Sequence, residues 1–277
     1  MKRLVSALVV VAAVASGLLV SSASGARDRG ADGHFEKRTS SHFVLYQDVD
    51  IDRTSGLRGS RNFENQVLKT LEQAYDQLDG VLGLRPERRL DVVIHDPGLF
   101  DAEFAGIFRF QAAGFYSGTI HVRGDTVVRA PLIRTLYHEL VHAAWDAEAP
   151  NLYLPAWLNE GVAEWFEARA IGKHQLSGGE AAALGRVARQ GALFSFGQLS
   201  DPSFGRMGPE AAQLAYLQSY AFIEFLAYRH GDDSIRRLCK TLMRKRDLDR
   251  ALQLTFRADL GELAERFAAD YGATTGG

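Results

Sequence analysis

Cysteine is nearly absent from this chain. Cys239 is the only cysteine among 277 residues, so no disulfide can form within the chain. Stability must come from other sources, and a hydrophobic content of 46% permits a sizeable core.

An excess of charge of one sign is lacking as well. The formal net charge is −2, which gives no electrostatic reason to expect a nucleic acid or an anionic membrane as a partner. We also find no internal repeat and no low-complexity tract. We therefore expect one domain, over residues 35–277.

A segment of distinct composition precedes this domain. Two basic residues stand before an apolar run over residues 4–20, and small residues follow the run. A positive start, an apolar middle and a small-residue exit are typical of a secretory signal peptide. We expect residues 1–26 to be this signal, with cleavage after Ser24 or Ala26, and residues 27–34 to be a linker.

The apolar run could instead remain as a membrane anchor, since its length is near the lower limit for a transmembrane helix. Its many alanines, with serines and a glycine, make it only weakly apolar, which favours cleavage. No cysteine lies near the exit, which argues against a bacterial-type lipoprotein. We expect an exported protein, secreted, periplasmic or held in the cell envelope, without stable membrane association after cleavage.

The central motif is His138-Glu139-Leu140-Val141-His142, an H-E-x-x-H pentad. Helical side chains four residues apart lie on one face, so both imidazoles can bind one metal ion. Glu139 follows His138 and lies on the adjacent part of the helix surface. From there it can reach a metal-bound water without binding the metal.

The pentad lies in a stretch with helical periodicity, residues 131–145. Ile133, Leu136, Leu140 and Ala144 recur at helical spacing and define a buried face, with the two histidines on the opposite side. H-E-x-x-H also occurs by chance on exposed helices, where it has no chemical meaning. The apolar periodicity around it favours a metal site.

A second helix is predicted to begin at Pro155 and to contain the sequence W-L-N-E-G-V-A-E. Glu160 and Glu164, four residues apart, share the face opposite its apolar residues. Glu160 is well placed as a third ligand, and three protein ligands plus a water distinguish a catalytic zinc site from a structural one. A solvated acidic stripe is the alternative interpretation, and the preceding histidine pair argues against it.

Together these motifs resemble the gluzincin branch of zinc metallopeptidases, the superfamily of thermolysin and the zinc aminopeptidases. The resemblance implies that Glu160 completes a zinc site with His138 and His142. It also implies that Glu164 accepts a hydrogen bond from a zinc-binding histidine and so fixes the orientation of that ring. Over residues 35–271 the chain is most similar to the small domains called peptidase-MA-like.

Residues 214–226 resemble the helix that carries the catalytic tyrosine of the zinc aminopeptidases. Tyr216 falls on that tyrosine, whose hydroxyl can donate a hydrogen bond to the developing oxyanion. Both Tyr216 and Tyr220 can also be ordinary core aromatics, and this alternative applies more to Tyr220.

One element departs from the aminopeptidases. Those enzymes carry a glutamate, in the strand before the pentad, that anchors the free amino group of the substrate. The matching stretch contains Gly114, Phe115 and Tyr116 but has neither Glu nor Asn over residues 113–123. We expect this stretch to bind the substrate as a strand, and the missing anchor favours endopeptidase action.

The whole pattern predicts an α+β fold of the zincin type. In it a small N-terminal mixed sheet with helices is followed by a helical C-terminal half, and the active-site helix lies between them. We expect strands at 41–46, 90–95 and 115–122, an irregular connection at 96–113, and helices at 63–82, 131–145, 155 onward, 179–190, 213–228, 234–243, 248–255 and 260–271.

Two functions fit these observations. The first is a zinc metallopeptidase that acts on a peptide or protein substrate, with Glu139 as general base. The second is a non-catalytic protein of the same fold that binds a protein or peptide partner. Glu139 would be lost easily from a degenerate site, so its presence favours the enzyme. The other histidines have no ligand spacing and are expected to be structural or at the surface: His34, His42, His95, His121, His174 and His230.

Overall fold

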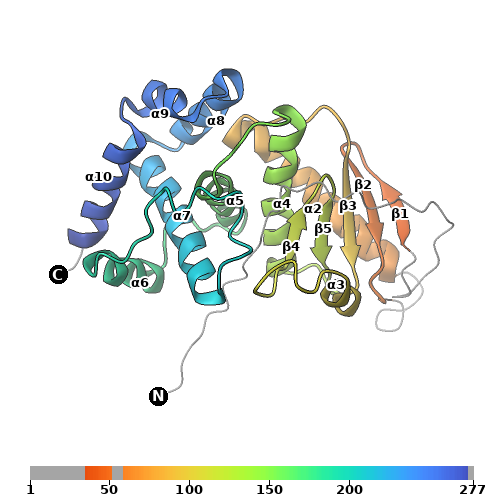
Figure 1. Cartoon of the computed structure of the whole chain (residues 1–277). Helices are drawn as coiled ribbons and strands as arrows, with labels where there is room; N and C mark the ends of the chain where they lie inside the picture. Colours follow the sequence, from red (N-terminus) through yellow and green to blue (C-terminus); the bar gives the residue numbers. More distant parts are fainter. Residues whose placement is uncertain (1–34, 52–58, 274–277) are drawn as a thin grey trace, which may run out of the picture.

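The computed structural model describes residues 35–51 and 59–273 (Figure 1). The predicted signal peptide and linker lie outside these residues. As predicted, the fold is α+β, with a mixed sheet in the N-terminal part and helices in the C-terminal part. Within the described residues, no helix is both long and apolar enough to span a bilayer. The elements are β1 (Glu36–Thr39), β2 (Phe43–Gln47), α2 (Gly59–Leu82), β3 (Leu90–His95), α3 (Pro97–Glu103), β4 (Gly114–Tyr116), β5 (Ile120–Arg123), α4 (Ala130–Glu148), α5 (Ala156–Ala170), α6 (Gly178–Arg189), α7 (Pro209–His230), α8 (Asp233–Lys245), α9 (Leu248–Phe256) and α10 (Leu260–Ala273).

The five strands form one sheet in the order β1-β2-β3-β5-β4. The three central strands run parallel, and the edge strands β1 and β4 each pair antiparallel with their neighbours. The register aligns Leu45 with Val92 and Ile94 with Val122, so these apolar side chains share one face. α2 and α4 cover this face and complete the main core. The opposite face carries His95 and His121 and packs against α3.

α4 lies between the sheet and the helical half (Figure 1). It contacts β4 and β5 on one side and α5 on the other. Leu136, Leu140 and Ala144 are fully buried on the face predicted from the periodicity. The histidine face is buried too, because α5 covers it.

α5 and α7 approach each other most closely at Gly161. A Cβ atom built on Gly161 would lie 2.7 Å from the backbone oxygen of Ser219 in α7, a distance that real Cβ atoms do not adopt. Glycine therefore allows the two backbones to touch. This contact sets Tyr216 of α7 beside Glu160 of α5.

The prediction of one strand over residues 115–122 was wrong. The segment forms two strands, β4 and β5, that pair as a hairpin. The turn between them contains Gly118 at φ +84°, a conformation that favours glycine. The apolar residues on both sides of this short turn alternate like those of a single strand, which hid it.

The connection at residues 96–113, predicted to be less regular, contains the short helix α3, which was not predicted. The side chain of Asp96 accepts hydrogen bonds from the backbone N–H groups of Gly98 and Leu99 and so caps this helix. β1 was not predicted, since its polar sequence gives no apolar alternation. The other predicted helices are all present with shifted ends; α2 begins at Gly59 and α7 at Pro209.

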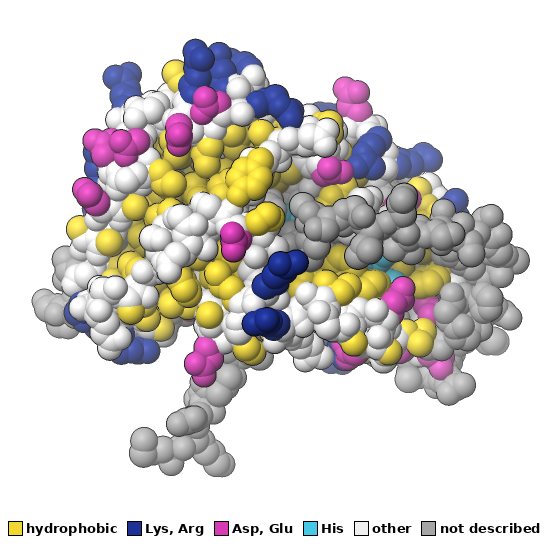
Figure 2. Space-filling model, viewed as in Figure 1, with side chains coloured by type: hydrophobic (Ala, Val, Ile, Leu, Met, Phe, Trp, Pro, Cys, Tyr) yellow, Lys and Arg dark blue, Asp and Glu magenta, His cyan; other side chains and the backbone are white. Residues whose placement is uncertain are grey.

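On the face shown in Figure 2, side chains of both charges are interspersed around the edges, and hydrophobic side chains gather over the helical half. This distribution agrees with the formal net charge of −2.

Candidate active site

α4 and α5 bring two rows of side chains face to face. Arg134, His138 and His142 follow each other at four-residue intervals on α4, and therefore lie on one face of that helix. The opposing row on α5 is acidic and consists of Glu160, Glu164 and Glu167. All members of both rows are buried except Arg134, which is partly exposed.

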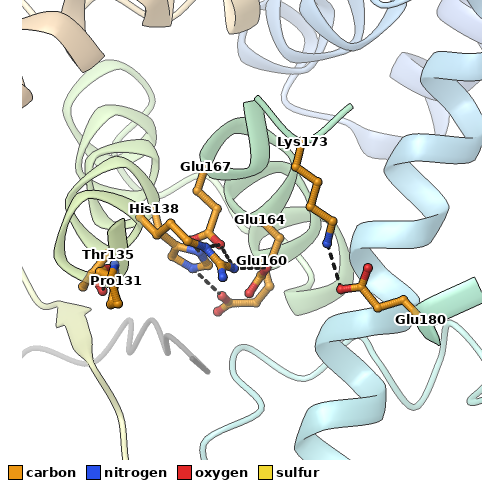
Figure 3. Close-up of polar contacts among 9 residues, drawn as sticks. Pro131, Thr135, His138, Glu160, Glu164, Glu167, Lys173 and Glu180 are labelled. Atoms are coloured by element: carbon orange, nitrogen blue, oxygen red, sulfur yellow. Dashed lines mark hydrogen bonds and ion pairs between the residues drawn. The ribbon is translucent and has the colours of Figure 1, made fainter. Parts of the chain in front are cut away.

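The three predicted metal ligands lie together. The Nε2 atoms of His138 and His142 are 3.1 Å and 3.6 Å from the same oxygen, Oε2 of Glu160. One ligand atom from each residue lies within 4.8 Å of the others. Figure 3 shows the side chains of His138 and Glu160 pointing toward each other from α4 and α5.

This group fits a bound metal ion. Nε2 of His142 is buried and has no hydrogen-bond partner among the described residues, although a buried polar nitrogen normally has one. Burial raises the pKa of Glu160, but the charge of His142 and the hydrogen bond with His138 outweigh it and lower the pKa to about 2. Two imidazoles and an ionised carboxylate are donors that suit a divalent transition metal.

Outer contacts orient both imidazoles. Nδ1 of His142 donates a hydrogen bond to Oδ1 of Asn159 at 2.9 Å. Nδ1 of His138 lies 3.4 Å from Oε2 of Glu167, an ion-pair contact that is not aligned as a hydrogen bond. A proton on each Nδ1 leaves each Nε2 free to bind a metal ion, which is how such partners set the tautomer of a ligand.

Glu164 was predicted to accept a hydrogen bond from a zinc-binding histidine, and in the structure the carboxylate 3.4 Å from Nδ1 of His138 is that of Glu167. Glu164 lies near His138 (Figure 3). It is 3.9 Å from Arg134. Burial, together with the charge of Glu167, raises the pKa of Glu164 to about 8. The sequence held a signal for Glu167, since it lies seven residues after Glu160 and therefore on the same face of α5.

Glu139 lies between the metal ligands and the sheet. Its side chain is fully buried, and neither carboxylate oxygen has a hydrogen-bond partner among the described residues. Burial raises its pKa well above the ordinary value. A Cβ atom on Gly114 would lie 3.3 Å from Cγ of Glu139 and 2.8 Å from Cγ2 of Thr135, so glycine allows β4 to approach α4 beside Glu139.

β4 is an edge strand, and among the described residues no strand pairs with its outer side. The N–H of Arg123 donates to the C=O of Ala113, and the N–H of Ser117 donates to the C=O of Thr119. Hydrogen-bonded and non-hydrogen-bonded pairs alternate in an antiparallel ladder. The backbone groups of Gly114 and Tyr116 therefore point away from β5, toward the open edge of the sheet.

The two large side chains of β4 are both engaged within the protein. The ring of Phe115 stacks on His121 with centroids 4.8 Å apart. The hydroxyl of Tyr116 donates a hydrogen bond of 2.6 Å to Asp146, near the C-terminal end of α4. These contacts hold β4 against its neighbours and leave its backbone as the part that faces outward.

Tyr216 lies beside the metal ligands. Its ring packs edge-on against Phe204 and Phe110, and its buried hydroxyl has no hydrogen-bond partner among the described residues. Burial, followed by the charge of Glu160, raises its pKa well above the ordinary value. Tyr220 is one turn further on, and the Lys173 ammonium lies over its ring at 4.8 Å.

A comparison with curated proteins gives no match. The family model described as the Peptidase MA superfamily matches residues 86–271. The match covers more than half of the chain and includes β3 to β5, the two rows of facing side chains and the helix of Tyr216. By this match and by the buried group of His138, His142 and Glu160, the chain belongs to the Peptidase MA superfamily.

Proposed function

We propose that this protein is a zinc-dependent endopeptidase. One observation carries the proposal: the ligand atoms of His138, His142 and Glu160 converge beside Glu139, whose buried carboxylate has no hydrogen-bond partner among the described residues. A carboxylate so placed can serve as a general base. Membership of the Peptidase MA superfamily supports the same conclusion.

Zinc is the metal that this donor set favours, because two histidines and a glutamate leave a fourth position for water. Zinc bound at these residues would polarise the scissile carbonyl and acidify the attacking water. Glu139 takes the proton of that water and passes it to the leaving nitrogen. Tyr216 donates a hydrogen bond to the oxygen of the former carbonyl as negative charge develops on it.

The substrate binds in extended form along β4. The outward-facing N–H and C=O groups of Gly114 and Tyr116 are suited to pairing with one more strand. Added in this way, a peptide runs past Glu139, because Gly114 lies against that side chain.

Internal cleavage is favoured because no carboxylate is placed to bind a free amino terminus on β4. Asp101 and Glu103 are two acidic residues that precede β4 in the sequence. Asp101 forms a two-fold hydrogen-bonded ion pair with Arg123, and Glu103 lies 3.9 Å from Nδ1 of His95. Asp101 is thus engaged elsewhere, and Glu103 lies beside His95, on the face of the sheet that packs against α3. We also propose that the protein is exported, on the composition of residues 1–26.

The proposal is tested with purified protein and a library of peptides blocked at both ends. We expect cleavage to disappear when the metal is removed with a chelator and to return when zinc is added. If the zinc-loaded protein bound library peptides but cut none of them, the non-catalytic alternative would be correct.

A further inference from the structure

The ring of His138 faces a second cluster on the side away from His142. One ligand atom each from His138, Glu164 and Glu167 lies within 4.8 Å of the others. Arg134 enters this cluster. Its Nε donates a hydrogen bond of 2.8 Å to Oε1 of Glu167, a terminal nitrogen contacts the same oxygen, and that nitrogen lies 3.9 Å from Oε2 of Glu164. A guanidinium therefore already supplies the cation here.

Glu167 is the carboxylate that most requires this cation, because Arg134 contacts it directly and lies 3.9 Å from Glu164. The side chain of Glu167 is fully buried and that of Glu164 is 8% exposed. Buried carboxylates are costly unless they are paired and hydrogen-bonded. The nearby Lys173 donates a 2.8 Å hydrogen bond to Glu180 instead (Figure 3). Among the residues that the structure describes, Arg134 is the cation in contact with both Glu164 and Glu167.

Arg134 is poorly placed to recognise a substrate. A hollow beside it has a volume of about 30 Å³, and its lining includes Glu164, Lys173, Glu180 and Tyr216. This space has the size of about one or two water molecules. The guanidinium is bound to Glu167, and its contacts run inward, toward His138.

We propose that Arg134 is a positioning residue, which holds Glu167 against Nδ1 of His138 and through it orients one ligand of the metal site. Arg134 itself touches neither the ligand atoms of the metal nor the substrate. The inference rests on the metal site of the proposed function and is independent of whether the protein cleaves peptides.

The test is a double-mutant cycle on metal affinity. The zinc dissociation constant is measured by competition with a coloured chelator for the wild type, Arg134→Gln, Glu167→Gln and the double variant. We expect each single variant to bind zinc about 10–100-fold more weakly, the usual effect of losing an outer partner of a ligand. The double variant should be no weaker than the weaker single variant, because Arg134 acts through Glu167. Additive losses, or an unchanged affinity in Arg134→Gln, would overturn the proposal.

One further variant excludes a general loss of folding. Arg134→Lys keeps the charge but loses the paired donors, so it should fold normally and bind zinc with an affinity between those of the wild type and Arg134→Gln. Wild-type affinity in this Lys variant would also overturn the proposal. Circular dichroism and thermal unfolding of the zinc-free proteins show whether each variant is folded. If Arg134→Gln is unfolded, the zinc affinity of Arg134→Lys tests the proposal in its place.

Glu164→Gln distinguishes the two carboxylates. It removes the other partner of Arg134 and leaves Glu167 in place, so the zinc affinity should stay within about twofold of the wild type. A large loss in Glu164→Gln with none in Glu167→Gln would assign the outer contact to Glu164 and contradict the proposal. If the wild type bound no zinc, the metal site itself would be refuted. If it bound zinc and cut no peptide, only the proposed activity would fail.

Discussion

The molecule contains two buried histidine pairs in very different surroundings. His138 and His142, on α4, turn their Nε2 atoms toward one carboxylate oxygen of Glu160. His95 and His121, on neighbouring strands, face each other, with Nε2 of the first 2.9 Å from Nδ1 of the second. We call His95 and His121 the sheet pair, and His138 and His142 the helix pair. Phenylalanine rings surround the sheet pair, whereas glutamates surround the helix pair.

The difference shows what makes a buried histidine pair a metal site. In the sheet pair each ring satisfies the other, and burial lowers the pKa of His95 to about 3 and that of His121 to about 4. In the helix pair the carboxylates of Glu160 and Glu167 outweigh burial and raise the pKa of His138 well above its ordinary value. Burial alone keeps a histidine neutral, and convergent carboxylates create a place for a cation.

The largest expected effect comes from removing the carboxylate that both helix histidines share. Glu160→Ala should lose stoichiometric zinc, because only two protein ligands remain. Metal analysis of the purified protein measures this loss. Normal zinc content in Glu160→Ala would place the third ligand at Glu164 instead.

Glu139→Gln should separate metal binding from chemistry. The amide cannot accept a proton, so peptide cleavage should fall by about 10²–10⁴-fold, while zinc content stays normal. Zinc content and the rate of peptide cleavage are measured on the same preparation of the variant. Wild-type turnover in this variant would rule out the proposed mechanism.

Tyr216→Phe tests the proposed oxyanion donor. We expect kcat to fall by about 10²–10³-fold with little change in KM, as for the loss of one such donor. Stability should change little, because the ring volume is kept. Tyr220→Phe is the matched control and should be close to the wild type. If Tyr220→Phe were inactive and Tyr216→Phe active, the assignment would be one helical turn out of register.

Because of the sheet pair, the free energy of unfolding should depend on pH on the acid side. The pKa values of His95 and His121 are lowered on folding, so below about pH 6.5 the unfolded chain binds protons that the folded chain does not. Stability is therefore lost as the pH falls from about 6.5 toward 4, by up to about 1.4 kcal/mol per pH unit for each histidine. Urea unfolding at pH 7 and pH 5 should show a smaller loss when both are replaced by glutamine. Equal losses in the two proteins would refute this account.

The smallest expected effect concerns the substrate. Peptides with free and with acetylated amino termini should be cleaved at similar rates, since β4 carries no carboxylate to bind an amino group. Paired kinetic assays on one peptide sequence measure the ratio. A strong preference for the free amine would point to Asp101 or Glu103 as an anchor.

The parts of the site that follow helical periodicity were predictable from the sequence. His138 with His142, and Glu160 with Glu164, lie on helices whose residues repeat at intervals of three and four, so their relative positions depend mainly on local geometry. That the two helices would face each other was suggested only by the family resemblance. The structure shows this packing.

Apart from the meeting of Glu160 with His138 and His142, the contacts made through tertiary packing were not predicted. Glu167 takes the place expected for Glu164 because of how α5 is rotated against α4, which the sequence does not state. Likewise His95 and His121 have no suggestive spacing and meet only through the parallel pairing of β3 and β5. The turn at Gly118 was missed since apolar alternation continues on both sides of it.

Gly161 affects which amino-acid substitutions this protein can tolerate in α5 and α7. Its contact with the backbone of Ser219 and the side chain of Ile223 brings α5 and α7 close together. Elsewhere along the two helices, a side chain replaced by one of similar volume can be accommodated by local repacking. A single methyl group at residue 161 cannot be absorbed in this way. It would move the whole of α7, and Tyr216 with it, although neither Tyr216 nor Glu160 had itself been changed.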